Sequence, residues 1–237
     1  MTITKHIPNF ITCLNLLAGC LGITEAFKGN LISAALFIIA GAVFDFFDGF
    51  IARLLKASSP IGKDLDSLAD VITFGLLPGI ILFQLLALSE EVPLTLKYLP
   101  LIVPVFSALR LAKFNNDPRQ TGSFIGVPTP ANALLIGSLP LIMKFNSELN
   151  LNVLIANPYF ILSLSIVMSL LLVAEIPLFA LKFKTFGWKD NQIVYIFVLI
   201  SAILLLLLNV AAIPLIIILY VILSVINNLL AGKRSNS

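Results

Sequence analysis

Charge is scarce in this sequence. Of its 237 residues only 11% are Asp, Glu, Lys or Arg, whereas a soluble globular domain has about 25%. There is one histidine, His6, and there are two cysteines, Cys13 and Cys20, both inside an apolar run. A soluble domain, a zinc site built from His and Cys, and a disulfide-stapled scaffold are therefore not expected. The net charge of +3 is small and gives no indication of a nucleic-acid partner.

Apolar residues fill most of the chain instead, with 59% hydrophobic residues and a mean hydropathy of +1.06. Runs of about 20 apolar residues cross a bilayer as helices. We expect residues 1–237 to form a single domain, with its functional residues in 45–70 and with the helices from about residue 157 at its periphery. The sequence predicts an all-α, polytopic membrane helical bundle with about eight transmembrane helices, at 7–27, 31–56, 65–89, 93–114, 129–145, 157–181, 191–208 and 210–231.

Lys and Arg are distributed unevenly among the predicted loops. If the N-terminus lies inside, twelve of the fifteen fall on the cytoplasmic side, and Lys28, Lys97 and Lys144 fall outside. Cytoplasmic loops of membrane proteins carry an excess of these residues. This distribution predicts that both termini are cytoplasmic. All seven aspartates fall on the same side, so a site built from them would face the cytoplasm.

Four aspartates, Asp45, Asp48, Asp66 and Asp70, lie in segments that are otherwise apolar enough to enter a membrane. An ionised carboxylate costs about 2.5–3.5 kcal/mol at the centre of a bilayer. The first two are i,i+3 on one predicted helix and the last two are i,i+4 on the next, so each pair shares a helix face. Four opposed carboxylates repel one another unless cations lie between them. We therefore expect a site for Mg²⁺, Mn²⁺ or Ca²⁺, which prefer oxygen ligands, rather than pairing with basic side chains.

Small and basic residues complete a fixed pattern over residues 45–70, D-x2-D-G-x2-A-R-x8-G-x3-D-x3-D. Gly49 and Ala52 allow a ligand to approach the helix backbone closely. Arg53 lies on the same helix and suits phosphate oxygens. Gly62 ends the connection between the two helices. The combination indicates a phosphoryl ligand coordinated by two metal ions.

This pattern resembles the signature of the CDP-alcohol phosphatidyltransferase family. The resemblance implies a membrane enzyme in which an alcohol displaces CMP from a CDP-linked lipid at two divalent cations, Mg²⁺ or Mn²⁺. It implies that Asp45, Asp48 and Asp66 are metal ligands and that Asp70 is both a metal ligand and the general base. The implied location is the prokaryotic cytoplasmic (inner) membrane, and homodimers are common in the family. The CDP-diacylglycerol site would be lined by Asp45, Gly49, Ala52, Arg53 and Gly62.

Further stretches within residues 5–135 resemble the phosphatidylserine synthase branch of this family. The implied acceptor is L-serine, whose carboxylate needs a positive partner. Arg110 and Lys113, i,i+3 near the end of a predicted helix, are the candidates, although such cations also serve as positive-inside anchors. Lys113 stands where the branch has arginine. Two alternatives stay open, namely another acceptor (glycerol 3-phosphate or inositol phosphate) and a cation transporter. The quoted stretches are I-P-N-F-I-T-C-L-N-L-L-A-G at 7–19, L-D-S-L-A-D-V-I-T-F-G-L-L-P at 65–78, A-L-R-L-A-K-F-N at 108–115 and G-S-F-I-G-V-P-T-P-A-N at 122–132.

Overall fold

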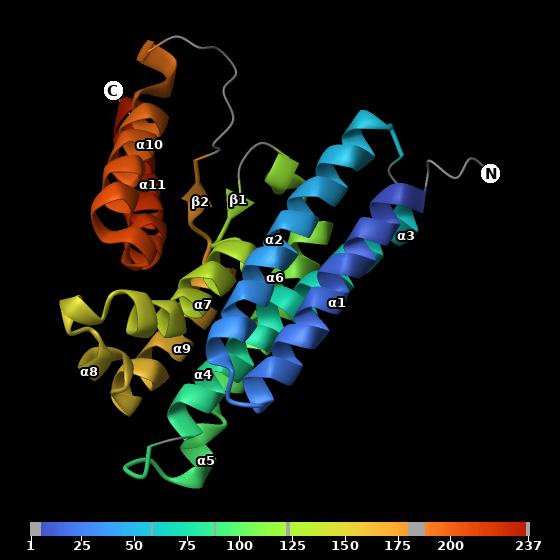
Figure 1. Cartoon of the computed structure of the whole chain (residues 1–237). Coiled ribbons are helices and arrows are strands. Elements are labelled where there is room, and N and C mark those ends of the chain that lie inside the picture. The colour runs from blue at the N-terminus through green and yellow to red at the C-terminus, as the bar shows by residue number, and fades with distance from the viewer. Residues whose placement is uncertain (1–5, 58, 88, 122–123, 180–187, 236–237) are drawn as a thin grey trace.

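The chain forms a bundle of helices (Figure 1). The computed structural model describes residues 6–57, 59–87, 89–121, 124–179 and 188–235, and at 120, 121, 124, 188–190 and 230–235 it describes the backbone alone. The predicted all-α membrane bundle is confirmed. By length and composition, five described segments can cross a membrane: Ile7–Phe27, Leu31–Leu54, Pro60–Ala87, Leu94–Asn116 and Asn191–Leu229.

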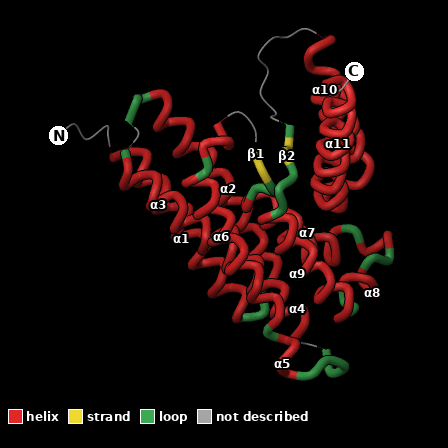
Figure 2. The backbone as a smooth tube through the Cα atoms, turned by 180° about the vertical axis from the view of Figure 1, so that it is seen from behind, coloured by secondary structure: helices red, strands yellow, loops and turns green. Residues whose placement is uncertain are grey.

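The helices α1 (Ile7–Phe27) and α2 (Leu31–Leu54) form an antiparallel pair at one side of the bundle (Figures 1 and 2). Gly29 lies in the turn between them with a φ of 83°, a conformation that glycine adopts without strain. The next helix, α3 (Pro60–Asp70), begins with Ser59 as its N-cap and proline in its first turn, both of which favour a helix start. The chain turns back at this point, and α3 packs against α1.

The third membrane segment is not a regular α-helix throughout. Directly after Asp70, α3 continues as the π-helical segment η2 (Val71–Leu76) and then as α4 (Leu77–Ala87). A π-turn is wider than an α-turn and rotates the residues that follow it, and such turns are frequent at functional sites. The hydrophobic pattern of the sequence predicted one helix here and did not predict the π-turn.

The second half of the bundle contains shorter elements between its long helices. In chain order the elements are α5 (Leu94–Lys97), η3 (Leu99–Leu101), α6 (Ile102–Asn116), η4 (Pro118–Thr121), β1 (Phe124–Ile125), α7 (Thr129–Phe145), η5 (Ser147–Leu149), α8 (Asn152–Ile155), α9 (Pro158–Val173) and β2 (Pro177–Leu178). The long helices of this part are α6, α7 and α9.

The helix predicted over 157–181 is shorter in the structure, because α9 ends at Val173 and Ala174 is extended, with a ψ of 139°. Pro177 prevents the helix from continuing to 181, since proline lacks an N–H and disfavours helical backbone at the residue before it. The strand β2 then pairs antiparallel with β1, with Ile125 opposite Pro177. This short pairing, which the sequence analysis did not predict, joins the loop before α7 to the segment after α9.

The last two helices, α10 (Trp188–Leu208) and α11 (Ala212–Ser235), lie side by side as a hairpin (Figures 1 and 2). The turn η6 (Asn209–Ala211) joins them, and Asn209 has a φ of 47°. The C-terminal end lies at the same end of the bundle as the N-terminus (Figure 1). The number of membrane crossings and the side on which the termini lie stay predictions.

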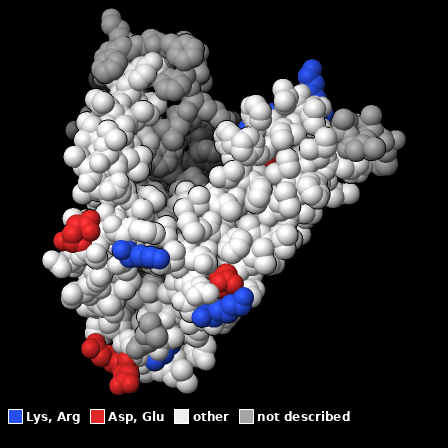
Figure 3. Space-filling model, viewed as in Figure 1, with Lys and Arg blue, Asp and Glu red and all other residues white. Residues whose placement is uncertain are grey.

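The core is apolar and centres on α4 and α7. Among its fully buried side chains are Leu77, Ile81, Leu86 and Ile136, and α9 adds Ile161. Many large apolar side chains face outward instead, and the face in Figure 3 has few charged groups. An apolar exterior of this kind suits contact with lipid.

Candidate active site

Three of the four predicted aspartates converge where α2 and α3 face each other. Asp45 and Asp48 on α2 and Asp66 on α3 each offer a carboxylate oxygen, and these three oxygens lie within 4.8 Å of one another. The i,i+3 spacing places the first two on one face of α2, as predicted. The structure thus brings together the carboxylates of both helices.

Asp70 lies next to this group but is not part of it. Its charge interacts with those of Asp45, Asp66 and Asp48, and it lies one turn beyond Asp66 along α3. The side chain is 7% exposed. Asp70 is therefore in electrostatic range of the cluster and deeper in the bundle.

Helix α1 donates one hydrogen bond to a carboxylate of α2 and one to a carboxylate of α3. Thr12 Oγ1 donates to Asp48 Oδ2 at 2.7 Å, and Asn15 Nδ2 donates to Asp70 Oδ1 at 3.2 Å. Both α1 residues are buried. Both residues lie in the stretch 7–19, and no role was predicted for either. The sequence does carry a signal for these residues, since Asn9, Thr12 and Asn15 repeat every three residues in the otherwise apolar stretch 7–23.

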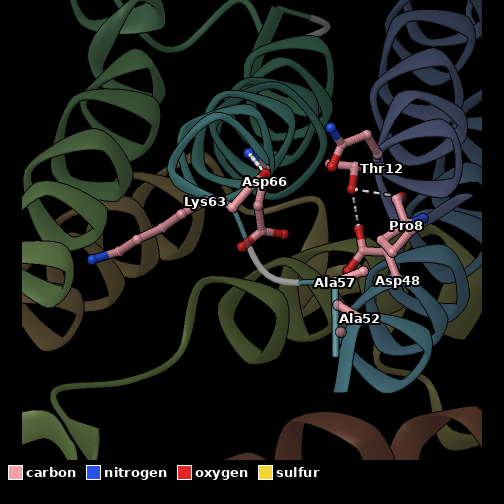
Figure 4. A pocket seen from close by; sticks show the side chains of 11 residues that line it. Pro8, Thr12, Asp48, Ala52, Ala57, Lys63 and Asp66 are labelled. Atoms are coloured by element: carbon pink, nitrogen blue, oxygen red, sulfur yellow. Dashed lines mark hydrogen bonds between the residues drawn. The ribbon is translucent and has the colours of Figure 1, made fainter. Parts of the chain in front are cut away.

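A cavity of about 220 Å³ opens beside the carboxylates (Figure 4). Asp48 and Asp66 face it from opposite sides, and the hydrogen bond from Thr12 to Asp48 closes one edge (Figure 4). Its lining includes three predicted nucleotide-site residues, Gly49, Ala52 and Gly62. The other lining residues are Pro8, Asn9, Thr12, Ala57, Ser59 and Lys63, which the sequence analysis did not assign to the site.

Two predicted nucleotide-site residues, Asp45 and Arg53, are not among those that line the cavity. The Arg53 side chain is exposed, and its Nη1 lies 3.4 Å from the position that a Cβ on Gly49 would take. Its contact with a nucleotide stays a prediction. Lys63 lines the cavity, but its ammonium group points away from it (Figure 4) and donates to Asn115 O on α6 at 3.0 Å.

Gly62 is held in a tight space at the N-terminus of α3. Its N–H donates to Ser59 Oγ at 3.0 Å. A Cβ at this position would lie 3.0 Å from Asn9 Oδ1 and 3.1 Å from Ser59 Oγ. A side chain here would press on both the cap and α1, so glycine keeps α1 and α3 close at the mouth of the cavity.

The two predicted acceptor residues differ in burial. Arg110 is 5% exposed, and its Nε donates to Val127 O at 2.7 Å. Its Nη2 is buried and has no hydrogen-bond partner among the described residues. The guanidinium interacts electrostatically with Asp70. Lys113 is exposed, so only Arg110 combines burial with a free donor.

Arg110 and Lys113 also line a small cavity of about 20 Å³ beside the segment after α9. At its rim, Arg119 Nη2 lies 2.7 Å from Asp117 and 3.8 Å from Glu175. The hydrogen bonds from Arg119 hold the pKa of Asp117 below its ordinary value. Glu175 thus lies near a cation at the surface, in the lining of the same small cavity.

The donor set suits hard divalent cations. Three carboxylates from two helices offer only oxygen, the ligand type that Mg²⁺ and Mn²⁺ prefer. Thr12 and Asn15 on α1 donate hydrogen bonds to Asp48 and Asp70, as outer-shell partners do to the carboxylates that ligate a metal. Asp45, Asp48 and Asp66 therefore fit a divalent-metal centre, and Asp70 interacts with it electrostatically.

Comparison with known proteins agrees with this geometry. The sequence model of the CDP-alcohol phosphatidyltransferase family matches residues 5–231, which extends well beyond the region of the quoted motifs. The CDP-diacylglycerol–serine O-phosphatidyltransferase of Bacillus subtilis is 38% identical over 126 residues, covering 53% of this chain and 70% of the relative. The enzyme of the same name from Mycobacterium leprae is 35% identical over 149 residues, covering 60% of this chain and 49% of the relative.

An archaeal relative matches at a similar level. The archaetidylserine synthase of Methanothermobacter thermautotrophicus is 34% identical over 146 residues, covering 61% of each chain. The aligned parts thus span from about half to 70% of these curated relatives.

Proposed function

The chain belongs to the CDP-alcohol phosphatidyltransferase family, and from this premise we propose that it transfers the phosphatidyl group of CDP-diacylglycerol to the hydroxyl of L-serine. The products are phosphatidylserine and CMP. The observation that carries the proposal is the convergence of Asp45, Asp48 and Asp66 within 4.8 Å beside a cavity. The serine acceptor is supported by the names of the relatives.

In the proposed reaction, the serine hydroxyl oxygen attacks the phosphorus that bears the diacylglycerol. The bond from this phosphorus to the bridging oxygen breaks, and CMP leaves with that oxygen. Asp70 accepts the hydroxyl proton, because a hydroxyl is a weak nucleophile until a base takes its proton. Asp45, Asp48, Asp66 and Asp70 would hold two Mg²⁺ or Mn²⁺ ions, which supply charge neutralisation on the diphosphate.

We assign the serine carboxylate to Arg110. Its buried Nη2 lacks a described partner, and a buried guanidinium gains most from a carboxylate because that bond is charge-assisted. The link from Nε to Val127 O fixes the direction of the side chain. Lys113 is more exposed and is assigned a secondary role in attracting the substrate.

The proposed setting is the prokaryotic cytoplasmic membrane, with the carboxylates facing the cytoplasm. The twelve cytoplasmic Lys and Arg residues of the topology support this orientation. CDP-diacylglycerol would enter from the inner leaflet, with its head group beside Gly49, Ala52 and Gly62. The chain would act as one domain and, like other family members, as a homodimer.

CMP release by the purified protein in detergent micelles tests this function. The assay supplies CDP-diacylglycerol, Mn²⁺ or Mg²⁺, and in turn L-serine, glycerol 3-phosphate or inositol phosphate. Of the three acceptors, we expect only L-serine to support CMP release, and we expect EDTA to abolish turnover. Turnover with a different acceptor would overturn the serine assignment, and turnover that survives EDTA would overturn the metal centre.

A further inference from the structure

Among the four aspartates, the two most buried ones are those bonded to α1. Asp48 is 6% exposed and Asp70 is 7% exposed, whereas Asp45 and Asp66 are partly exposed. Thr12 reaches the first and Asn15, one turn along, reaches the second. Each donor contacts one named carboxylate oxygen, Oδ2 of Asp48 or Oδ1 of Asp70. Thr12 Oγ1 also lies 3.1 Å from Pro8 O, and the backbone of Gly49 is a second hydrogen-bond partner of Asp48.

The position of Asn15 is fixed by the π-turn that follows Asp70. Thr73, in this turn, is fully buried, and its Oγ1 donates to the backbone oxygen of Asn15 at 2.9 Å. A Cβ on Gly19 would lie 2.5 Å from Thr73 Oγ1, and one on Gly41 would lie 2.3 Å from Thr73 Cγ2. Thr73 is therefore wedged between α1 and α2, and only glycine at these two positions leaves room for it.

We propose that Thr12 and Asn15 are positioning residues, each of which fixes one oxygen of a buried carboxylate and so aims the other oxygen at the ligand. Thr12 orients Asp48 for a cation, and Asn15 orients Asp70 for the acceptor hydroxyl. The assignment of these two targets rests on the proposed function, whereas the two hydrogen bonds are observed in the structure independently of it.

A carboxylate needs this kind of support because rotation about its last side-chain bond is soft, with broad energy wells. A donor bonded to one oxygen selects one plane for the group. A misplacement of about 1 Å at a reacting group can cost about 100-fold in rate. Loss of an outer-shell partner typically costs about 10- to 100-fold in metal affinity or activity.

Two variants separate the two roles. In Thr12→Val the donor is lost while the shape is kept, and we expect the Mn²⁺ dissociation constant to rise about 10-fold, measured by electron paramagnetic resonance on the purified protein without substrate. Thr12→Ser keeps the hydroxyl and should restore the affinity. In Asn15→Ala we expect kcat to fall about 10- to 100-fold, with the KM for CDP-diacylglycerol within about twofold of the parent.

Matched controls lie on the same helical hairpin. Thr24 donates to Cys20 O within α1, and Asn30 donates to Glu25 in the turn, so Thr24→Val and Asn30→Ala should leave both measurements unchanged. The proposal is overturned if Thr12→Val binds Mn²⁺ like the parent, or if Asn15→Ala lowers kcat and raises the KM for CDP-diacylglycerol to the same extent, which indicates a merely structural role. A parent protein that binds Mn²⁺ but makes no CMP with serine would contradict the proposed function, and the Mn²⁺ measurement on Thr12→Val would still test the positioning.

Discussion

The two ends of the chain use their helices in opposite ways. Where α1, α2 and η2 meet, polar side chains point inward and glycines let the helices approach, as at Gly41 beside Thr73. In the α10–α11 hairpin, the long apolar side chains point outward, and Leu206 and Leu207 are 83% and 72% exposed. The first region places polar atoms in a defined geometry, whereas the second presents apolar surface to its surroundings.

This difference follows from what each region must bury. Polar groups in an apolar interior are costly unless they are hydrogen-bonded, so the first region requires fixed helix distances and a fixed register. Leucines that face lipid require neither, because lipid tails are as apolar as the side chains. We therefore expect substitutions to be much more harmful in the first region than in the second.

The largest effect is expected at the carboxylate cluster. Asp66→Asn keeps the size of the side chain but removes a negative charge from the group within 4.8 Å. We expect kcat/KM for CMP release to fall about 100- to 1,000-fold, as when one electrostatic partner of a reaction is removed. Asp64→Asn, on the exposed side of the same helix, is the matched control and should keep the parent activity. Equal activity of the two variants would contradict a role for the cluster.

The next effect tests the close helix approach. In Gly41→Ala the new Cβ would lie 2.3 Å from Thr73 Cγ2 and 2.9 Å from Asn15 Oδ1. Because Thr73 is branched at Cβ and held on both sides, we expect the overpacking to cost about 1–3 kcal/mol in the free energy of unfolding, observed as a lower Tm in detergent.

Gly49→Ala is the control for this substitution. Its new Cβ would meet Arg53 Nη1 at 3.4 Å, an ordinary contact with a flexible side chain. Its Tm should stay near that of the parent, while the KM for CDP-diacylglycerol rises because Gly49 lines the cavity. A Tm for Gly41→Ala as high as that of Gly49→Ala would mean that α1 and α2 adjust freely, and the first region would then resemble the hairpin.

The sequence predicted the parts of this structure that depend on periodicity. Apolar runs predicted a helix at each of eight places, and described helices lie in all of them. The spacing of Asp45, Asp48, Asp66 and Asp70 predicted their convergence, and the structure brings oxygens of the first three within 4.8 Å of one another but leaves Asp70 outside this group. Both depend on helix geometry, and helix geometry is the same wherever the helix packs.

Other features depend on how helices pack and were not predictable in this way. The π-turn at Val71–Leu76 changes the direction of Thr73 without a change in the hydrophobic pattern. Arg53 was predicted to contact a phosphate, but its side chain is exposed. Lys63, for which no role was predicted, lines the cavity but turns its ammonium group toward Asn115. The direction of a long, flexible side chain depends on neighbouring residues that are distant in the sequence.

The smallest effect is expected in the hairpin, at Leu206. This side chain is 83% exposed, so Leu206→Ala removes apolar surface without leaving a buried void. Substitutions away from packed or bonded features usually change stability by less than about 0.5 kcal/mol, and we expect both Tm and CMP release to match the parent in detergent. A clear loss of activity would show that the hairpin supports the site, either through a second copy of the chain or through α7, which α11 contacts. Size-exclusion chromatography with light scattering would separate these two causes, since only the first also changes the oligomeric state.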